Sequence, residues 1–272
     1  MAITSFIPTV WSESLLTQLD REYIAVRNCT REFEGDIKEK GSTVKIGGIG
    51  AINVFDYTKD TDMSAPEALS DYAKTLTIDQ AKAFNFQIDD IDKAQAQPKL
   101  MQAAMSQAAA ALADVADQYV YSLYTEAVHK IIVDGVVVDD MLELIAEARR
   151  KLTMHKVNSN VPTALEVTPD IASYILRAKA LQSTDNTEAM ENGALGKMFG
   201  FDIYVSHNVP KVDGRHKCIV RTKRAVAFAE QLNEVEAYRP ESRFADAVKG
   251  LHLYGAKIVY PDEFVVLDIA LA

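Results

Sequence analysis

The sequence is poor in the features that mark secreted, membrane and small disulfide-rich proteins. Its 272 residues include only two cysteines, Cys29 and Cys218, which are far apart and form no CxxC pair. No apolar run reaches the roughly eighteen residues of a membrane span, and the N-terminus lacks a basic stretch followed by an apolar one. These absences exclude a disulfide scaffold, a CxxC zinc module, a classical secretion signal and a membrane-spanning helix. We expect both thiols to be buried and unreactive.

Positive charge is also scarce. The chain carries 29 basic and 39 acidic residues, a formal net charge of -10. A protein whose main task is to grip nucleic-acid phosphates needs an excess of Lys and Arg, so this balance argues against such a task. With 48 % hydrophobic residues the chain is long enough to bury a substantial core, in one large domain or two intertwined ones.

Motifs of catalysis and cofactor binding are missing as well. The five histidines form no HExxH pattern, and no GxSxG nucleophile motif occurs. The GGIG stretch at 47–50 lacks the Lys-Ser/Thr of a phosphate-binding loop, and GALGKMFG precedes a strand instead of joining a strand to a helix. We therefore predict no enzyme activity, no catalytic or cofactor-binding residue and no metal ligand.

Two charged stretches leave an alternative open. Asp62, Ser64 and Asp71 are spaced like calcium-loop ligands, but Ala65 stands where that loop needs glycine, so we favour a polar loop tip. The stretch RHKCIVRTKR could meet an acidic neighbour or a phosphate, but we favour a solvated strand face. Its basic residues are Arg215, Lys217, Arg221, Lys223 and Arg224.

Four aspartates in TLTIDQAKAFNFQIDDIDKAQAQ raise the question of a carboxylate site. Apolar residues alternate with polar ones from Phe84 to Ile88, which predicts a half-buried strand. On such a strand neighbouring carboxylates point to opposite faces and do not converge. We therefore expect turn and helix-entry roles over catalysis or metal binding for the aspartates, which are Asp79, Asp89, Asp90 and Asp92.

The N-terminal half predicts extended elements. Strand-like stretches on either side of a polar tip, residues 58–72, predict a long two-stranded excursion. Apolar residues spaced by three and four predict a helix over about 97–128, about 48 Å long. A compact chain of this length is only roughly 50 Å across. We therefore expect other subunits to cover the excursion, and the apolar residues of the first forty positions to seek a partner surface.

The C-terminal half predicts a more compact module. One helix face is formed by Met141, Ile145, Ala148 and Leu152. TALEVTPDIASYILRAKAL predicts a strand and then a helix that begins at Thr168 as N-cap. Further strands are expected in FDIYVSHNVP, in KCIVRTKRAVAFAEQ, and on both sides of Pro261 and Asp262 in the tail.

The order of the pieces is more specific than any one of them: an apolar arm, GSTVKIGGIG, a polar tip, TLTIDQAKAFNFQIDDIDKAQ, a long Ala-rich helix, GFDIYVSHNVP, AVAFAEQ and YGAKIVYPDEFVVL. This order resembles the major capsid proteins of tailed bacteriophages over nearly the whole chain, in the branch that includes podovirus-type coat proteins. The resemblance implies an α+β, HK97-like capsid fold. Its parts would be an N-terminal arm (1–40), an extended β-hairpin loop (41–90), a peripheral domain with the spine helix (91–160), an axial domain (161–235) and return strands of the peripheral domain (236–272).

The resemblance also implies a function and partners. The protein would self-assemble through pentamers and hexamers into an icosahedral shell around double-stranded DNA that it does not bind specifically. It would assemble in the bacterial cytoplasm and end in the virion. A portal, a scaffolding protein that is separate or has been removed, and a decoration protein are implied partners. An encapsulin-like nanocompartment shell is the alternative.

Specific contacts follow from the implied loop and arm. We predict intersubunit contacts for Trp11, Val54, Phe55, Leu76 and Ile78, and mobility of the tip in the free subunit. Lys59 and Lys74 lie near the tip, but nothing in the sequence identifies a partner for a covalent cross-link, so none is predicted.

Overall fold

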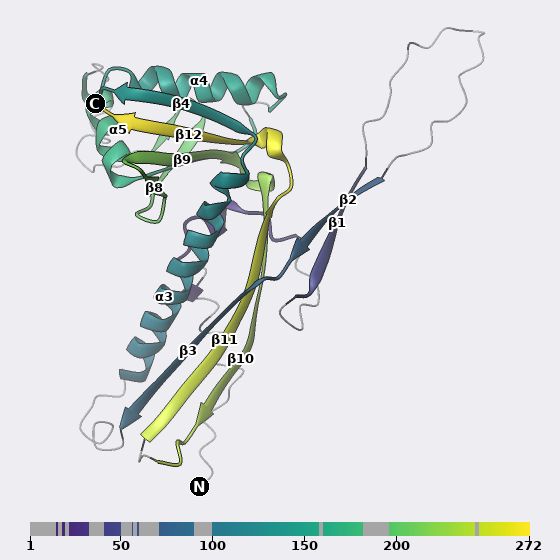
Figure 1. The fold of residues 1–272 in the computed structure, drawn as a ribbon, viewed down its shortest axis with the longest axis vertical. Helices are drawn as coiled ribbons and strands as arrows, with labels where there is room; N and C mark the ends of the chain where they lie inside the picture. Colours follow the sequence, from purple (N-terminus) through teal and green to yellow (C-terminus); the bar gives the residue numbers. More distant parts are fainter. Residues whose placement is uncertain are drawn as a thin grey trace.

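A computed structural model describes residues 15, 18, 19, 22–32, 41–49, 56, 59, 71–89, 100–157, 160–181, 196–242 and 245–272. Figure 1 shows three units: a long helix beside a three-stranded sheet, a layered unit at one end of that slab, and a hairpin that projects to the side. Among the described helices, none is long and apolar enough to cross a membrane.

The slab consists of helix α3 (Leu100–Ser122) and three antiparallel strands in the order β10, β11, β3. Their bounds are Val226–Tyr238, Ala245–Ile258 and Gln80–Asp89. Phe84 and Phe86 alternate with exposed residues along β3 and pack against the core that α3 shares with the sheet. The alternation that predicted a half-buried strand is thereby confirmed, and α3 confirms the long helix, about 35 Å of it at 1.5 Å per residue.

The layered unit holds a seven-stranded sheet and two helices. The strands run in the order β4, β12, β9, β5, β7, β6, with β8 paired to β9. They span β4 His129–Val136, β5 Thr163–Val167, β6 Lys197–Met198, β7 Phe201–Val205, β8 Lys211–Val212, β9 Arg215–Thr222 and β12 Phe264–Leu271. The helices are α4 (Met141–Met154) and α5 (Pro169–Leu181).

Both faces of the central strands are buried. Along β12, Val265 and Leu267 face the core that contains α4 and α5, whereas Phe264 and Val266 face the core that contains α3. The predicted apolar face of α4 is buried as expected, and the Thr168 hydroxyl accepts a hydrogen bond from the Ile171 amide at 3.4 Å, in agreement with its predicted N-cap position. The sheet therefore joins the two cores into one body, which comprises the slab and the layered unit.

Three short passages connect the slab to the layered unit, and each is a 3-10 helix. The helix η2 (Leu123–Glu126) leads from α3 toward β4, η3 (Lys223–Ala225) leads from β9 to β10, and η4 (Pro261–Glu263) leads from β11 to β12. A further 3-10 helix, η1 (Val26–Asn28), comes shortly before Thr30, which bridges to Ala227 of β10.

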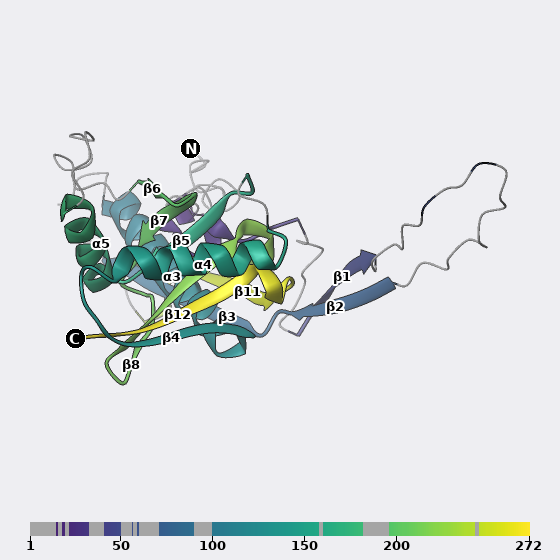
Figure 2. The same ribbon diagram turned by 90° about the horizontal axis from the view of Figure 1, so that it is seen from above.

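The hairpin consists of β1 (Thr43–Ile49) and β2 (Asp71–Thr77), which pair from Thr43 with Thr77 to Ile49 with Asp71. Figure 2 shows the same strands from above, reaching away from the body. The predicted two-stranded excursion is therefore present, but β3 is not part of it, because β3 pairs along its whole length with β11.

Two expectations about partners and boundaries differ from the structure. Leu15 and Leu19, expected to seek a partner surface, are fully buried in the subunit's own core. The expected domain limits at 160 and 235 do not coincide with the sheets, since β4 and α4 pack in the layered unit and β10 lies in the slab. Local periodicity finds strands and helices but carries no information on which sheet a strand joins.

Candidate functional site

The hairpin is attached to the body by a small apolar cluster, which we call the hairpin root. Ile46, Leu76 and Ile78 are each at most 2 % exposed. They pack on residues from β10, β11 and the segment after β11, namely Ala227, Ala229, Leu253 and Val259. The root therefore fixes the direction in which the hairpin leaves the subunit.

The root also shows where the predicted contact residues lie. Leu76 and Ile78 are covered by their own chain, so in the single subunit they serve as anchors, and their contact with a neighbour stays a prediction. Trp11, Val54 and Phe55 fall outside the described residues. Beyond the root, the described strands of the hairpin pair only with each other. An isolated two-stranded sheet is marginally stable in water, so this element gains stability from any surface that covers it.

A glycine allows the chain to cross at the root. A Cβ at Gly255 would lie 2.3 Å from the Thr77 carbonyl oxygen and 3.1 Å from the Ile78 Cα. Both atoms belong to the backbone, which cannot move aside as a flexible side chain can. Gly255 therefore lets the segment between β2 and β3 pass directly over β11.

Behind the root, a fully buried ion pair joins the sheet to the N-terminal segment. Arg221 donates to both carboxylate oxygens of Glu166 at 2.8 and 2.9 Å, and it also donates to the Ala25 carbonyl at 2.7 Å. Asn28 donates to Glu166 at 3.0 Å. Burial acts to lower the pKa of Arg221, but its negative partner more than offsets this and keeps the guanidinium charged. The pair holds residues 25–28 against β5 and β9.

A second buried carboxylate holds the same segment from the side of α3. Asp117 accepts hydrogen bonds from the Ile24 and Val26 amides at 2.8 and 3.0 Å. Burial raises the pKa of Asp117 to about 6, although these hydrogen bonds act in the opposite direction. The carboxylate therefore replaces backbone partners that the turn at residues 24–26 does not supply.

A third carboxylate, Glu230, lies at the junction of the N-terminal segment and the slab. It accepts hydrogen bonds from Tyr23 at 2.5 Å and His252 at 2.9 Å, and it pairs with Arg31. Burial acts to raise the pKa of Glu230, but the hydrogen bond from His252 and the charge of Arg31 bring it below its usual value. These three carboxylates all pin one segment, an arrangement suited to rigidity.

Sequence reasoning missed these three carboxylates, although a signal was present. Asp117 follows Ala113 and Ala116 on the buried side of α3, and Glu166 lies between the buried Leu165 and Val167. A charged residue in such a setting needs a partner inside the protein. The identity of the partner depends on the fold and was not available from the sequence.

The basic stretch RHKCIVRTKR is not a solvated strand face, so that expectation was wrong. Arg221 is fully buried, and Arg215 and Lys217 both donate to Asp268 on the neighbouring β12. Arg224 donates to Glu263. The alternative of acidic neighbours is correct, and those neighbours lie in the same subunit.

The aspartates of the 75–97 stretch do not form a carboxylate site among the described residues. Asp79 accepts a hydrogen bond from Tyr119 at 2.8 Å, and Asp89 ends β3 opposite Ala245. Asp90 and Asp92 lie outside the described residues, as do Asp62 and Ser64 of the calcium-like spacing. Gly47 and Gly48 lie within β1, as expected for a strand and not for a phosphate loop. Both cysteines are buried, and burial raises the pKa of each thiol.

Comparison with known proteins gives one family. A model described as phage capsid protein matches residues 72–267, which covers the slab and nearly all of the layered unit. The comparison with curated proteins gives no match.

Several solved structures share the architecture. A structure from Mycobacterium phage Che8 is 27 % identical, with 90 % of each chain covered and a TM-score of 0.72. The capsid of cyanophage P-SCSP1u is 17 % identical, with 90 % of this chain and 86 % of that one covered and a TM-score of 0.68. A virus-like particle from Pyrococcus furiosus is 14 % identical, with 95 % and 98 % covered and a TM-score of 0.58. The last two show a common fold only.

Proposed function

The chain belongs to the phage capsid protein family, and from this premise we propose that it closes its shell by laying the β1–β2 hairpin over a neighbouring subunit. The protein is a major capsid protein that forms the icosahedral shell of a phage, and it is a structural protein and not an enzyme. Its place is the capsid of the virion.

The observation that carries the proposal is the contrast between the root and the strands beyond it. The root is fully buried, whereas the strands leave the body and pair only with each other among the described residues. Because such a ribbon is marginal by itself, cover by a second copy would stabilise it. A hairpin that reaches from one copy to the next makes a head-to-tail contact, and rings and shells close through contacts of this kind.

The same logic assigns roles to the rest of the chain. We assign the slab with α3 to the peripheral domain with its spine helix, and the layered unit to the axial domain near the centre of pentamers and hexamers. We propose the podovirus-type coat branch for the chain, and the resemblance of residues 75–97 supports this proposal. A scaffolding protein, a portal and a decoration protein remain proposed partners, and double-stranded DNA is the proposed content. The net charge of -10 supports enclosure without tight binding.

A shell of the cellular nanocompartment type is the alternative function. The Pyrococcus furiosus particle has the same fold at 14 % identity, which by itself does not separate the two functions. The match to the phage capsid family favours the phage shell.

The test replaces residues 50–70 by Asn-Gly, a two-residue turn that suits the pairing of Ile49 with Asp71. We expect the variant to fold, with the circular dichroism and melting temperature of the parent, but to give no closed shells in electron micrographs. The control keeps the native loop and carries Lys59→Gln, which should assemble normally. Closed shells of normal size from the shortened variant would overturn the role of the hairpin.

Limited proteolysis gives a second reading of the same contact. We expect trypsin to cut after Lys59 in free subunits and to leave assembled particles intact there. Lys74 is a poorer site than its sequence position suggests, because it lies within β2 and its ammonium group donates to the Val259 carbonyl. Equal cleavage after Lys59 in both states would show that the segment is an ordinary surface loop.

A further inference from the structure

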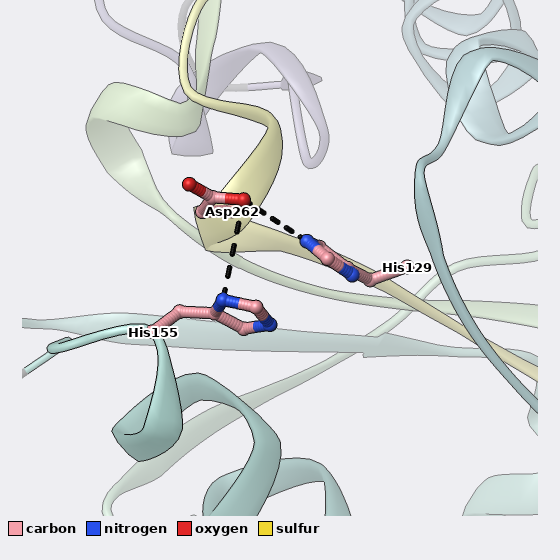
Figure 3. A group of neighbouring side chains, drawn as sticks. All are labelled: His129, His155 and Asp262. Carbon is pink, nitrogen blue, oxygen red and sulfur yellow. Dashed lines mark hydrogen bonds and ion pairs between the residues drawn. The ribbon is translucent and has the colours of Figure 1, made fainter.

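Two histidines and an aspartate meet where the slab joins the layered unit. His129 Nε2 lies 3.0 Å from Asp262 Oδ1, and His155 Nδ1 lies 4.0 Å from the same oxygen (Figure 3). One ligand atom from each residue falls within 4.8 Å of the other two. The two imidazole rings have their centroids 4.2 Å apart.

We propose that His129, His155 and Asp262 form a binding site for a divalent transition metal of the zinc class. Two imidazole nitrogens and one carboxylate oxygen are a donor set that zinc accepts in open sites, with water in the remaining position. Zinc bonds of about 2.0–2.1 Å place the ligand atoms of a tetrahedral site roughly 3.4 Å apart. The distances from the two imidazoles to Asp262, 3.0 and 4.0 Å, bracket that value, and all three ligand atoms lie within 4.8 Å of one another, so side-chain rotations have to bring them only slightly closer.

A simple hydrogen-bonded pair does not account for the third residue. Asp262 is satisfied by the 3.0 Å contact with His129, whereas 4.0 Å is too long for a hydrogen bond from His155. A second ring aimed at the same oxygen from that distance leaves room for a cation between the three atoms.

The fold holds all three backbones in place. His129 begins β4 and pairs with Val265, whereas His155 caps α4 through its amide, which donates to the Leu152 carbonyl at 3.1 Å. Asp262 lies in the single turn of η4. The side chains of His129 and His155 are 18 % and 29 % exposed, and that of Asp262 is 69 % exposed, so a metal can enter from solvent.

The position gives the site a mechanical role. His129 follows η2, and Asp262 lies within η4, so two of the three ligands lie on passages between the slab and the layered unit. A bound metal would tie these passages to the end of α4. Lys74 of the hairpin lies near enough to act on Asp262, and its positive charge opposes the cation. The site would therefore add a cross-link between these two passages and α4, close to the foot of the hairpin.

The experiment titrates zinc into the full chain, made without a polyhistidine tag and freed of metal, by calorimetry, and follows cobalt in the visible spectrum. We expect the parent to bind one zinc ion per chain, and we expect this binding to depend on the three residues. Bound cobalt should give the visible absorption bands of a tetrahedral site. His129→Gln and His155→Gln should each weaken zinc binding at least about tenfold, and zinc should raise the melting temperature of the parent but not of these two variants.

The matched control is His207→Gln, because His207 also faces a carboxylate, Asp114, at 3.1 Å, and this pair has no third ligand among the residues that the structure describes. It should leave binding unchanged. Circular dichroism of the metal-free variants shows whether they fold. If His129→Gln does not fold, His155→Gln carries the test, because His155 lies at the end of α4. Absence of saturable zinc binding by the parent, or equal binding by the folded variants, would overturn the proposal.

Discussion

The strands of the hairpin and the strands of the body differ in how many partners they have within the subunit. In the body, β9 and β12 have a strand on each side and a core on each face, and even Arg221 and Glu166 are paired inside. In the hairpin, β1 and β2 have one partner each, and of the side chains whose burial is described in these strands only those of the root are buried. The body therefore folds on the contacts of one chain, whereas the hairpin is left with surface to offer to another.

The two regions also differ in how polar groups are used. Three buried carboxylates, Asp117, Glu166 and Glu230, fix the N-terminal segment to the body. The hairpin root is built from packed apolar side chains, with one polar contact beside them, from the Lys74 ammonium to the Val259 carbonyl. Charged contacts with demanding geometry suit a part that must keep one shape, and apolar contacts suit an attachment that has to tolerate small changes of direction.

The largest effect is expected from Arg221→Met. The change leaves Glu166 buried without its partner, so we expect a loss of about 3–5 kcal/mol in the free energy of unfolding, measured in denaturant. Glu166→Gln combined with Arg221→Met should recover much of the loss. Lys197→Ala is the control, because the Lys197–Asp202 pair is solvent exposed and its removal should change stability by about 0–1 kcal/mol.

Hydrogen exchange shows whether the loss is confined to the body. At a temperature where Arg221→Met remains folded, we expect the amides of β1 and β2 to exchange at the rates of the parent. A loss as small as that of the control would mean that the buried pair does not hold the body together.

A smaller effect, local to the junction, is expected from Gly255→Ala. The new Cβ meets the backbone at Thr77, so β2 must move away from β11, at a cost of about 1–3 kcal/mol. Gly47→Ala in β1 is the control, since nothing lies within 4 Å of a Cβ there. We expect faster hydrogen exchange at the hairpin root and fewer closed shells for Gly255→Ala only. Equal shell yields from the two variants would break the link between the root and assembly.

Much of the secondary structure was predictable because local patterns determine it. Alternation at Phe84 and Phe86 predicted a strand, and Thr168 before Pro169 predicted the start of a helix. What failed was the pairing of distant segments. The partner of β3 is β11, well over a hundred residues away in sequence, and no local pattern names it.

The candidate sites show the same limit. The basic residues of β9 and η3 were visible, but their carboxylate partners lie on β5, β12 and η4. His129, His155 and Asp262 share no motif spacing, so only the fold brings them together. Leu76 and Ile78 were recognised as apolar residues that need cover, and the part of that cover seen in the subunit comes from its own chain.

The last and most gradual effect is a pH dependence of the free energy of unfolding, which we expect in the body and not in the hairpin. Burial raises the pKa of Asp117 to about 6 in the folded protein, whereas an unfolded aspartate titrates near 3.9. Between these values the folded state binds more protons than the unfolded state. The contribution of Asp117 is therefore fully present below pH of about 4 and is lost as the pH rises toward about 6, with a slope of at most about 1.4 kcal/mol per pH unit. Glu230 acts with the opposite sign, because its lowered pKa removes stability as the pH falls, so only a difference between two proteins isolates Asp117.

Asp117→Asn provides that difference. The amide does not titrate, and its carbonyl oxygen still accepts from the Ile24 or Val26 amide. Subtracting the unfolding free energies of the variant from those of the parent at each pH should give a line that falls from about pH 4 to about pH 6 and is flat above. Hydrogen exchange in β1 and β2, corrected for its intrinsic pH dependence, should show no such step, because none of the residues that contact Asp117 belongs to the hairpin root. A flat difference across the whole range would show that the pKa of Asp117 is the same in the folded body as in the unfolded chain, so that burial does not raise it. A step of equal size in the hairpin would show that the two regions unfold as one unit.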